Sequence, residues 1–150
     1  MENPLATTRL SRTEDLDNRD LDNEDGFKRE RLILVAEDSA DSAITISLHL
    51  QQSGYQVVMA NDGEEAVKVT ALSRPDLILM DLAMPVLDGL AATRRIREES
   101  PSPHIPIIAI TAFSTAGFLQ AAHDVGFDGY LTKPIDFGRM DDLIKTLLGI

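Results

Sequence analysis

Apolar and polar positions follow two different periods along most of the chain. Short, nearly continuous apolar runs, which are typical of buried strands, recur from residue 31 onward. Between them, apolar residues recur at spacings of three and four, as on one face of a helix. Strands are expected at Leu32–Ala36, Tyr55–Ala60, Leu77–Met80, Ile105–Ile110 and Gly129–Thr132. Helices are expected at Ser39–Ser53, Asp62–Leu72, Leu90–Glu99, Phe113–Val125 and Phe137–Leu148.

This alternation predicts a doubly wound α/β fold, in which a five-stranded parallel sheet carries helices on both faces. Central strands of such a sheet are covered on both sides, so they are apolar throughout. That description fits the runs Leu32–Val35, Leu77–Met80 and Ile107–Ile110. The run Tyr55–Met59 contains Gln56 and suits an edge of the sheet.

The first 30 residues show neither period. Acidic residues alternate there with Asn, Arg and isolated Leu, which predicts a disordered acidic arm at residues 1–30 before one domain at residues 31–150. The alternative is a short helix through Leu10, Leu16 and Leu21, but its apolar face is too sparse to stabilise an isolated helix.

The overall charge excludes some functions. The chain has 25 acidic and 14 basic residues and a formal net charge of -11, which disfavours direct binding to nucleic acid. It has no cysteine, which excludes disulfides and thiolate metal sites. No apolar run approaches the ~18 residues of a membrane span, and no secretory signal is recognisable, so we expect no membrane association and a cytoplasmic location.

Polar residues follow the expected strands where those strands end. In an open α/β sheet the carboxyl ends of the strands form the ligand-binding edge. The residues at this edge are Glu37, Asp38, Asp81, Thr111 and Lys133. Each alone is explained as a helix cap or a solvated charge, but their coincidence at one edge predicts a functional site.

The residue types at this edge favour phosphate chemistry. Three neighbouring carboxylates repel one another and need a cation, and oxygen ligands without Cys or paired His suit Mg²⁺. Mg²⁺ commonly completes its shell with water and a phosphate. Lys133 and Thr111 can then bind phosphoryl oxygens, and Asp81 can attack phosphorus as a nucleophile.

The chain resembles the receiver domain of two-component response regulators over residues 31–150. The resemblance rests on four segments in the family's order, namely Glu37-Asp38, Asp81–Gly89, Ile110–Ala112 and Tyr130–Pro134. It implies a flavodoxin-like strand order of 2-1-3-4-5. It also implies a function: phosphoryl transfer to Asp81 from a histidine kinase or a histidine phosphotransfer protein, followed by a switch in protein–protein contacts.

The resemblance assigns further roles to single residues. Asp81 is the phosphoacceptor, and Mg²⁺ is bound by Glu37, Asp38, Asp81 and the backbone carbonyl of Ala83. Thr111 and Lys133 contact the phosphoryl group, Thr111 and Tyr130 form the switch, and the Lys133-Pro134 peptide is cis. A protein of this kind assists its own phosphorylation and dephosphorylation and is not a multiple-turnover metabolic enzyme.

Several alternatives stay open at this point. The sequence ends just after the fifth expected helix, which favours a single-domain regulator, but a receiver from a hybrid histidine kinase would look the same. An FMN binder would need phosphate donors where Glu37 and Asp38 stand. A phosphohydrolase with an Asp nucleophile usually has an acid two residues later, where Ala83 stands.

Other features are less specific. The expected helix Phe113–Val125 has few charges, so a downstream protein or a second copy of the chain could dock there. By the resemblance, Ala83 and Phe113 flank the path of the hydrolytic water and offer nothing to orient it, which predicts slow self-dephosphorylation. The remaining candidates read as surface residues without a function: His49, His104, His123, Arg94, Arg95 and Arg97.

Overall fold

The computed structural model describes residues 29–99, 103–112 and 116–150. The chain divides into two units, Met1–Glu30 and Arg31–Ile150, and the fold described below is that of the second. The predicted acidic arm, apart from Arg29 and Glu30, lies outside the described residues, as does Phe113.

Five parallel strands form one sheet in the order β2-β1-β3-β4-β5, so the predicted fold and strand order are confirmed. The strands are β1 (Leu32–Ala36), β2 (Gln56–Ala60), β3 (Leu77–Asp81), β4 (Ile107–Thr111) and β5 (Gly129–Thr132). The helices are α3 (Ala40–Gln52), α4 (Gly63–Ser73), α5 (Gly89–Glu99), α6 (Ala116–Val125) and α7 (Phe137–Leu148).

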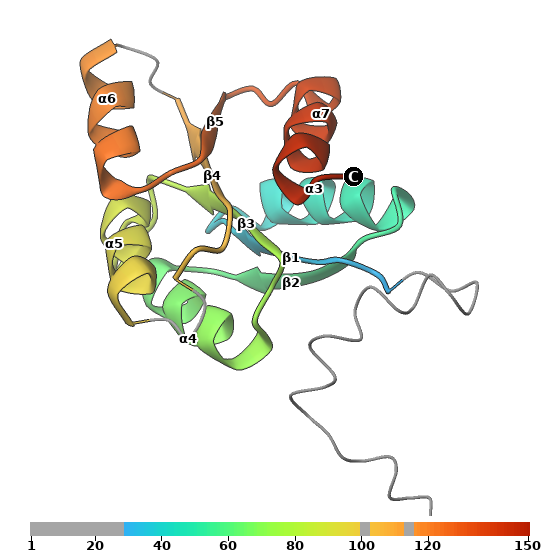
Figure 1. Cartoon of the computed structure of the whole chain (residues 1–150), viewed down its shortest axis with the longest axis horizontal. Coiled ribbons are helices and arrows are strands. Elements are labelled where there is room, and N and C mark those ends of the chain that lie inside the picture. The colour runs from blue at the N-terminus through green and yellow to red at the C-terminus, as the bar shows by residue number, and fades with distance from the viewer. Residues whose placement is uncertain (1–28, 100–102, 113–115) are drawn as a thin grey trace, which may run out of the picture. The chain divides into compact units, whose positions relative to one another are not determined.

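The helices lie in two layers on opposite faces of the sheet (Figure 1). Helices α3 and α7 pack on the face that carries Ile33, Val35 and Leu79, and α4, α5 and α6 pack on the face that carries Leu34 and Met80. Alternate residues of each strand therefore enter different cores. Burying each of these large side chains contributes about 1.5–3 kcal/mol, so the central strands are stabilised from both faces.

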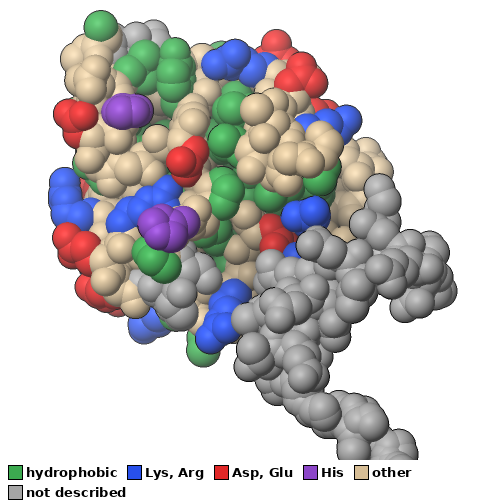
Figure 2. Space-filling view, viewed as in Figure 1, with side chains coloured by type: hydrophobic (Ala, Val, Ile, Leu, Met, Phe, Trp, Pro, Cys, Tyr) green, Lys and Arg blue, Asp and Glu red, His purple; other side chains and the backbone are tan. Residues whose placement is uncertain are grey.

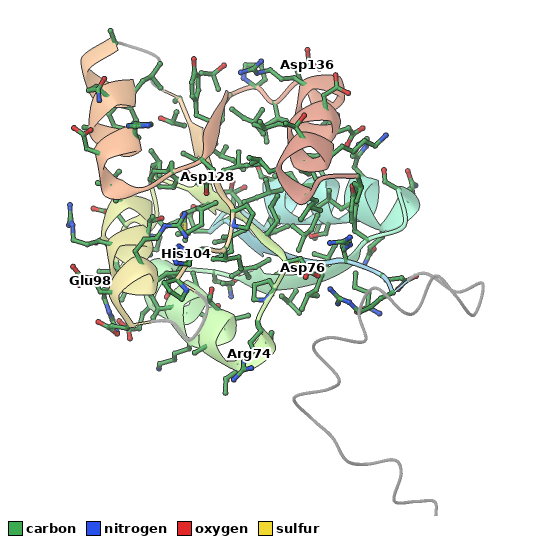
Figure 3. The ribbon with its side chains drawn as sticks, viewed as in Figure 1. Arg74, Asp76, Glu98, His104, Asp128 and Asp136 are labelled. Atoms are coloured by element: carbon green, nitrogen blue, oxygen red, sulfur yellow. The ribbon has the colours of Figure 1, made fainter. Side chains whose placement is uncertain are left out.

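Carboxylates fix the amino-terminal ends of two central strands (Figure 3). Asp76 Oδ2 accepts a 2.8 Å hydrogen bond from Leu32 N, and Asp128 Oδ2 accepts one of 2.8 Å from Ile107 N. Strand β4 begins at Ile107 and not at the expected Ile105, because the intervening Pro106 has no N–H to donate to the ladder.

Capping side chains close the starts of two helices. Asp62 Oδ1 accepts from Glu65 N at 2.7 Å, and Glu65 Oε1 accepts from Asn61 N at 2.6 Å, which together close the start of α4. Ser39 caps α3 by accepting from Ser42 N. None of the described helices is long and apolar enough to cross a membrane.

Candidate functional site

Asp81 is the last residue of the fully buried strand β3 and is itself only 1% exposed. Its Oδ2 accepts a 2.8 Å hydrogen bond from Lys133 Nζ, and its Oδ1 accepts one of 2.9 Å from Ala83 N. Lys133 directly follows β5 and donates its backbone N–H to Thr111 O at 2.8 Å. The sheet thus brings residues 52 positions apart into direct contact at its carboxyl edge.

Two further carboxylates follow β1 and complete an acidic cluster. Glu37 is 1% exposed, whereas Asp38 is exposed. One oxygen from each of Glu37, Asp38 and Asp81 lies within 4.8 Å of the others. Glu37 Oε2 accepts from Ser39 N at 3.1 Å, while Glu37 Oε1 is buried without a hydrogen-bond partner and lies 3.7 Å from Lys133 Nζ.

Burial and neighbouring charge shift two pKa values at this cluster. Burial raises the pKa of Glu37 to about 7, and the hydrogen bond and negative charge of Asp81 act in the same direction. Burial disfavours the charged form of Lys133, but its hydrogen bond to Asp81 and the charges of Asp81 and Glu37 outweigh this and raise its pKa. One lysine therefore faces three carboxylates, and the site carries excess negative charge.

The cluster fits a hard divalent cation. The donors are carboxylate oxygens, which Mg²⁺ prefers, and the buried Oε1 of Glu37 has no hydrogen-bond partner. A cation there would coordinate that oxygen and favour the charged form of Glu37, which burial and the neighbouring Asp81 disfavour. Ala83 lies two residues after Asp81, in the loop beside the cluster.

The two expected switch residues lie on neighbouring strands. Thr111 ends β4 and is buried, whereas Tyr130 on β5 is 38% exposed. Tyr130 pairs with Ala109 in the sheet, and the Arg139 guanidinium lies 5.9 Å from the centre of its ring. The peptide between Lys133 and Pro134 is cis, as predicted.

Two glycines pack closely against backbone atoms of β3 and of the loop that follows it. A Cβ on Gly89 would overlap the carbonyl of Asp81 and the Cα of Leu82, and one on Gly63 at the start of α4 would overlap the carbonyl of Leu87. Both contacts are to backbone, which cannot move cheaply. Gly89 belongs to the Asp81–Gly89 segment of the family resemblance, whereas the sequence contains no signal for the contact of Gly63 with this loop.

The same loop contains a strained residue that the sequence did not reveal. Val86 has φ = 69° and is 80% exposed, and Leu87 N donates to Pro85 O at 2.7 Å across it. This i to i+2 hydrogen bond makes a tight γ-turn centred on a β-branched residue, for which positive φ is costly. The strained residue lies five positions after Asp81, and strained backbone is common in loops at functional sites.

Replacing Val86 with glycine should therefore stabilise the domain by about 1 kcal/mol, because glycine adopts positive φ without steric cost. Urea unfolding monitored by circular dichroism measures the change. Val86→Ile is the matched control, since it keeps the β-branch and should give no gain. A loss of stability in Val86→Gly would show that the turn is not strained.

The prediction that Arg97 and His49 are surface residues without a function is wrong, because both make structural contacts. Arg97 donates to the carbonyls of Pro103, Ile105 and Gly126 at 2.6–3.1 Å and to Asp128, and so joins two loops at the amino-terminal edge. His49 Nε2 lies 2.9 Å from Asp141 Oδ1 and links α3 to α7. Side-chain partners distant in sequence leave no local pattern.

The other residues of that group lie at the surface. Arg95 pairs with Glu64 on α4 and Glu99 on its own helix, while Arg94, His104 and His123 are exposed. On the face shown in Figure 2, acidic and basic side chains are interspersed and form no continuous basic patch. Among the described residues, none of these arginines or histidines adjoins the acidic cluster.

Comparison with known proteins gives a consistent result. Residues 33–145 match the model of the response regulator receiver domain. The polar-differentiation response regulator DivK of Brucella anthropi is 33% identical over 117 residues, which are 78% of this chain and 95% of that protein. DivK of Brucella ovis is 32% identical over the same share of both chains.

Solved structures show the same fold. The receiver domain of the sensor histidine kinase PA1611 from Pseudomonas aeruginosa, described with a magnesium ion coordinated in its active site cleft, has a TM-score of 0.75 and 34% identity over 81% of this chain and 100% of its own. The chemotaxis protein CheY4 of Vibrio cholerae has a TM-score of 0.75 and 28% identity over 79% of this chain and 99% of its own. The chain belongs to the response regulator receiver domain family.

Proposed function

We propose that this chain accepts a phosphoryl group on Asp81 from a phosphohistidine of a histidine kinase or a histidine phosphotransfer protein. The observation that carries the proposal is the environment of the Asp81 carboxylate. It is almost fully buried, lies 2.8 Å from Lys133 Nζ and is grouped with two further carboxylates. Such an acid is protected from water yet faces an edge where phosphate can bind.

In the proposed reaction a carboxylate oxygen of Asp81 attacks phosphorus, the phosphorus–nitrogen bond of the donor breaks, and the donor imidazole leaves as the neutral base after taking up a proton. Lys133 offers positive charge to a phosphoryl oxygen, and Thr111 offers its hydroxyl to another. Glu37, Asp38, Asp81 and the Ala83 carbonyl would hold Mg²⁺, which supplies charge neutralisation during the transfer. Holding these groups in place before the donor arrives lowers the barrier.

The number of phosphoryl groups transferred per chain distinguishes this switch from a phosphohydrolase, which would also use an aspartate nucleophile. With excess acetyl phosphate and Mg²⁺, intact mass spectrometry should show one phosphoryl group per chain, and a generic phosphomonoester should not be hydrolysed over many turnovers. Sustained turnover without a phosphorylated intermediate would favour the hydrolase. Phosphorylation of Asp81 should also decay slowly, given the apolar Ala83 beside the site.

The output is proposed to be a change in protein contacts at α6 and β5. Leu119 and Ala122 of α6 line a cleft of about 230 Å³ with Phe127 and Tyr130. Phe118 packs partly buried against the core, so Leu119 is the better residue for probing this face. Thr111 and Tyr130 would bias this face between two states when Asp81 is phosphorylated.

The two tyrosines of the chain allow a direct test of the switch. In protein labelled with fluorotyrosine, the ¹⁹F resonance of Tyr130 should shift on phosphorylation, while that of Tyr55 at the far end of the sheet should stay in place. Tyr130→Phe assigns the signals. Thr111→Val should reduce the shift of the Tyr130 resonance, because it removes the hydroxyl expected to bind the phosphoryl group. Equal shifts of the Tyr130 and Tyr55 resonances would contradict a local switch.

A further inference from the structure

Tyr130 lies on the last strand of the sheet, between helices of both layers. In the sheet order β5 follows β4, and it runs between α6 and α7 (Figure 1). The register partner of Tyr130, Ala109, belongs to the core on the face that α4, α5 and α6 cover, so the side chain of Tyr130 points to that face. There the partly exposed ring lines a cleft with Leu119 and Ala122 of α6.

Arg139 reaches this ring from the other helical layer. It lies in the first turn of α7, where its backbone N–H donates to Asp136 Oδ1 at 3.1 Å. One turn later, the side chain of Leu143 lies so close to Gly129 that a Cβ on this glycine would come within 3.0–3.4 Å of it. Arg139 and Leu143 are four residues apart and share one face of the helix. Helix α7 therefore packs beside β5 at the residue before Tyr130, and this packing fixes the backbone from which the Arg139 side chain extends.

The polar groups of these two side chains have few other contacts. The centre of the Arg139 guanidinium lies 5.9 Å from the centre of the Tyr130 ring, within the range of a cation–π interaction. Asp136 and Asp142 line the same surface hollow as Arg139. Within the part of the chain that the structure describes, however, the guanidinium forms no ion pair and the Tyr130 hydroxyl forms no hydrogen bond. The ring is thus the partner that the structure shows for this cation.

We propose that Arg139 is a positioning residue of the switch, whose guanidinium holds the Tyr130 ring in its outward, partly exposed position and opposes the inward position that phosphorylation of Asp81 favours. This inference rests on the switch role of Tyr130 under the proposed function. A contact that exists in only one of two states favours that state by its own free energy. Because an exposed cation–π contact is weak, we expect it to change the ratio of outward to inward rings by about two- to fivefold.

The same contact should weaken the binding of a phosphoryl group at Asp81. Under the proposed switch, chains with an inward ring bind the phosphoryl group more tightly, so the apparent affinity rises with the fraction of such chains. Removing the guanidinium raises that fraction and should strengthen binding by up to the same factor of about two to five. The loss of a positive charge alone would weaken the binding of an anion, so the charge effect and the switch effect have opposite signs.

Titration of the full chain with beryllium fluoride, which mimics a phosphoryl group on a carboxylate, tests the proposal in the presence of Mg²⁺. The ¹⁹F signal of the bound anion measures its occupancy without any label on the protein. Arg139→Gln should lower the dissociation constant of the mimic by about two- to fivefold. Lys145→Gln removes the same charge from another exposed position of α7 and is the matched control, which should not strengthen binding.

A second background assigns the effect to the aromatic ring. In Tyr130→Leu, which keeps an apolar side chain without a π-system, Arg139→Gln should no longer strengthen binding, because the contact is already absent. The proposal is overturned if Arg139→Gln binds the mimic no more tightly than the wild type, or if the gain persists in Tyr130→Leu. Failure of the proposed function would look different, since the wild-type chain itself would then not bind the mimic, and this inference would fall with it.

Discussion

Asp81→Asn is expected to abolish phosphorylation by acetyl phosphate, with a labelling rate at least about 10³-fold below that of the wild type. The amide nitrogen and oxygen of asparagine are poor nucleophiles, and Glu37, the other buried carboxylate of the cluster, lies farther from Lys133 Nζ, at 3.7 Å against 2.8 Å for Asp81. Asparagine has nearly the same shape, so β3 should stay intact. Intact mass spectrometry over time measures the labelling, and circular dichroism checks the fold.

Asp88→Asn is the matched control for that variant. Asp88 belongs to the same loop but is exposed, and its Oδ1 accepts from Ala91 N at 2.9 Å at the start of α5. Asparagine caps helices about as well as aspartate, so stability should change little. Labelling should remain within about twofold of the wild type. Persistent labelling of Asp81→Asn would place the phosphoacceptor elsewhere.

The second large effect concerns Mg²⁺ binding and its pH dependence. Glu37 must lose its proton to bind a cation, and its pKa of about 7 means that it is mostly protonated at pH 6. Mg²⁺ affinity should therefore fall by about tenfold between pH 8 and pH 6. Glu37→Gln should weaken Mg²⁺ binding at pH 8 and make the remaining affinity nearly independent of pH over this interval.

The same raised pKa of Glu37 predicts how the stability of the metal-free domain depends on pH. A carboxyl group whose pKa is higher in the folded state binds more protons there, so stability from this group falls as pH rises from about 4.5 to about 7. Glu37→Gln should remove that loss, which amounts to about 3 kcal/mol. Isothermal titration with Mg²⁺ and urea unfolding at several pH values measure the two effects.

Glu65→Gln on α4 is the control for Glu37→Gln. It removes a carboxylate that caps Asn61 N, outside the acidic cluster, and should leave both the Mg²⁺ affinity and its pH profile unchanged. An unaltered pH profile in Glu37→Gln would contradict the assignment of Glu37 as the titrating ligand.

The fold could be predicted from the sequence because its determinants are local. Leu32–Ala36 and Phe137–Leu148 have in the structure the bounds that their periods predict, since apolar runs and helical spacing are decided within a few residues. The edge position of β2 followed from its polar Gln56. The acidic cluster could also be expected, because parallel strands deliver their last residues to one edge.

What the sequence could not predict depends on tertiary contacts. The carbonyl partners of Arg97 and the carboxylate partner of His49 come from distant loops and helices. The positive φ of Val86 is imposed by the loop around it, against the preference of the residue itself. The pKa of Glu37 depends on its burial beside Asp81, which spacing alone does not reveal.

The most direct test of the central claim identifies the phosphorylated residue. Wild-type chain is treated with acetyl phosphate, with Mg²⁺ or with a chelator, and the acyl phosphate is reduced with borohydride before digestion and mass spectrometry. The account predicts a single modified residue, Asp81, and labelling that is lost when Mg²⁺ is chelated. Modification of a different residue, or equal labelling of Asp81 without a divalent cation, would contradict it.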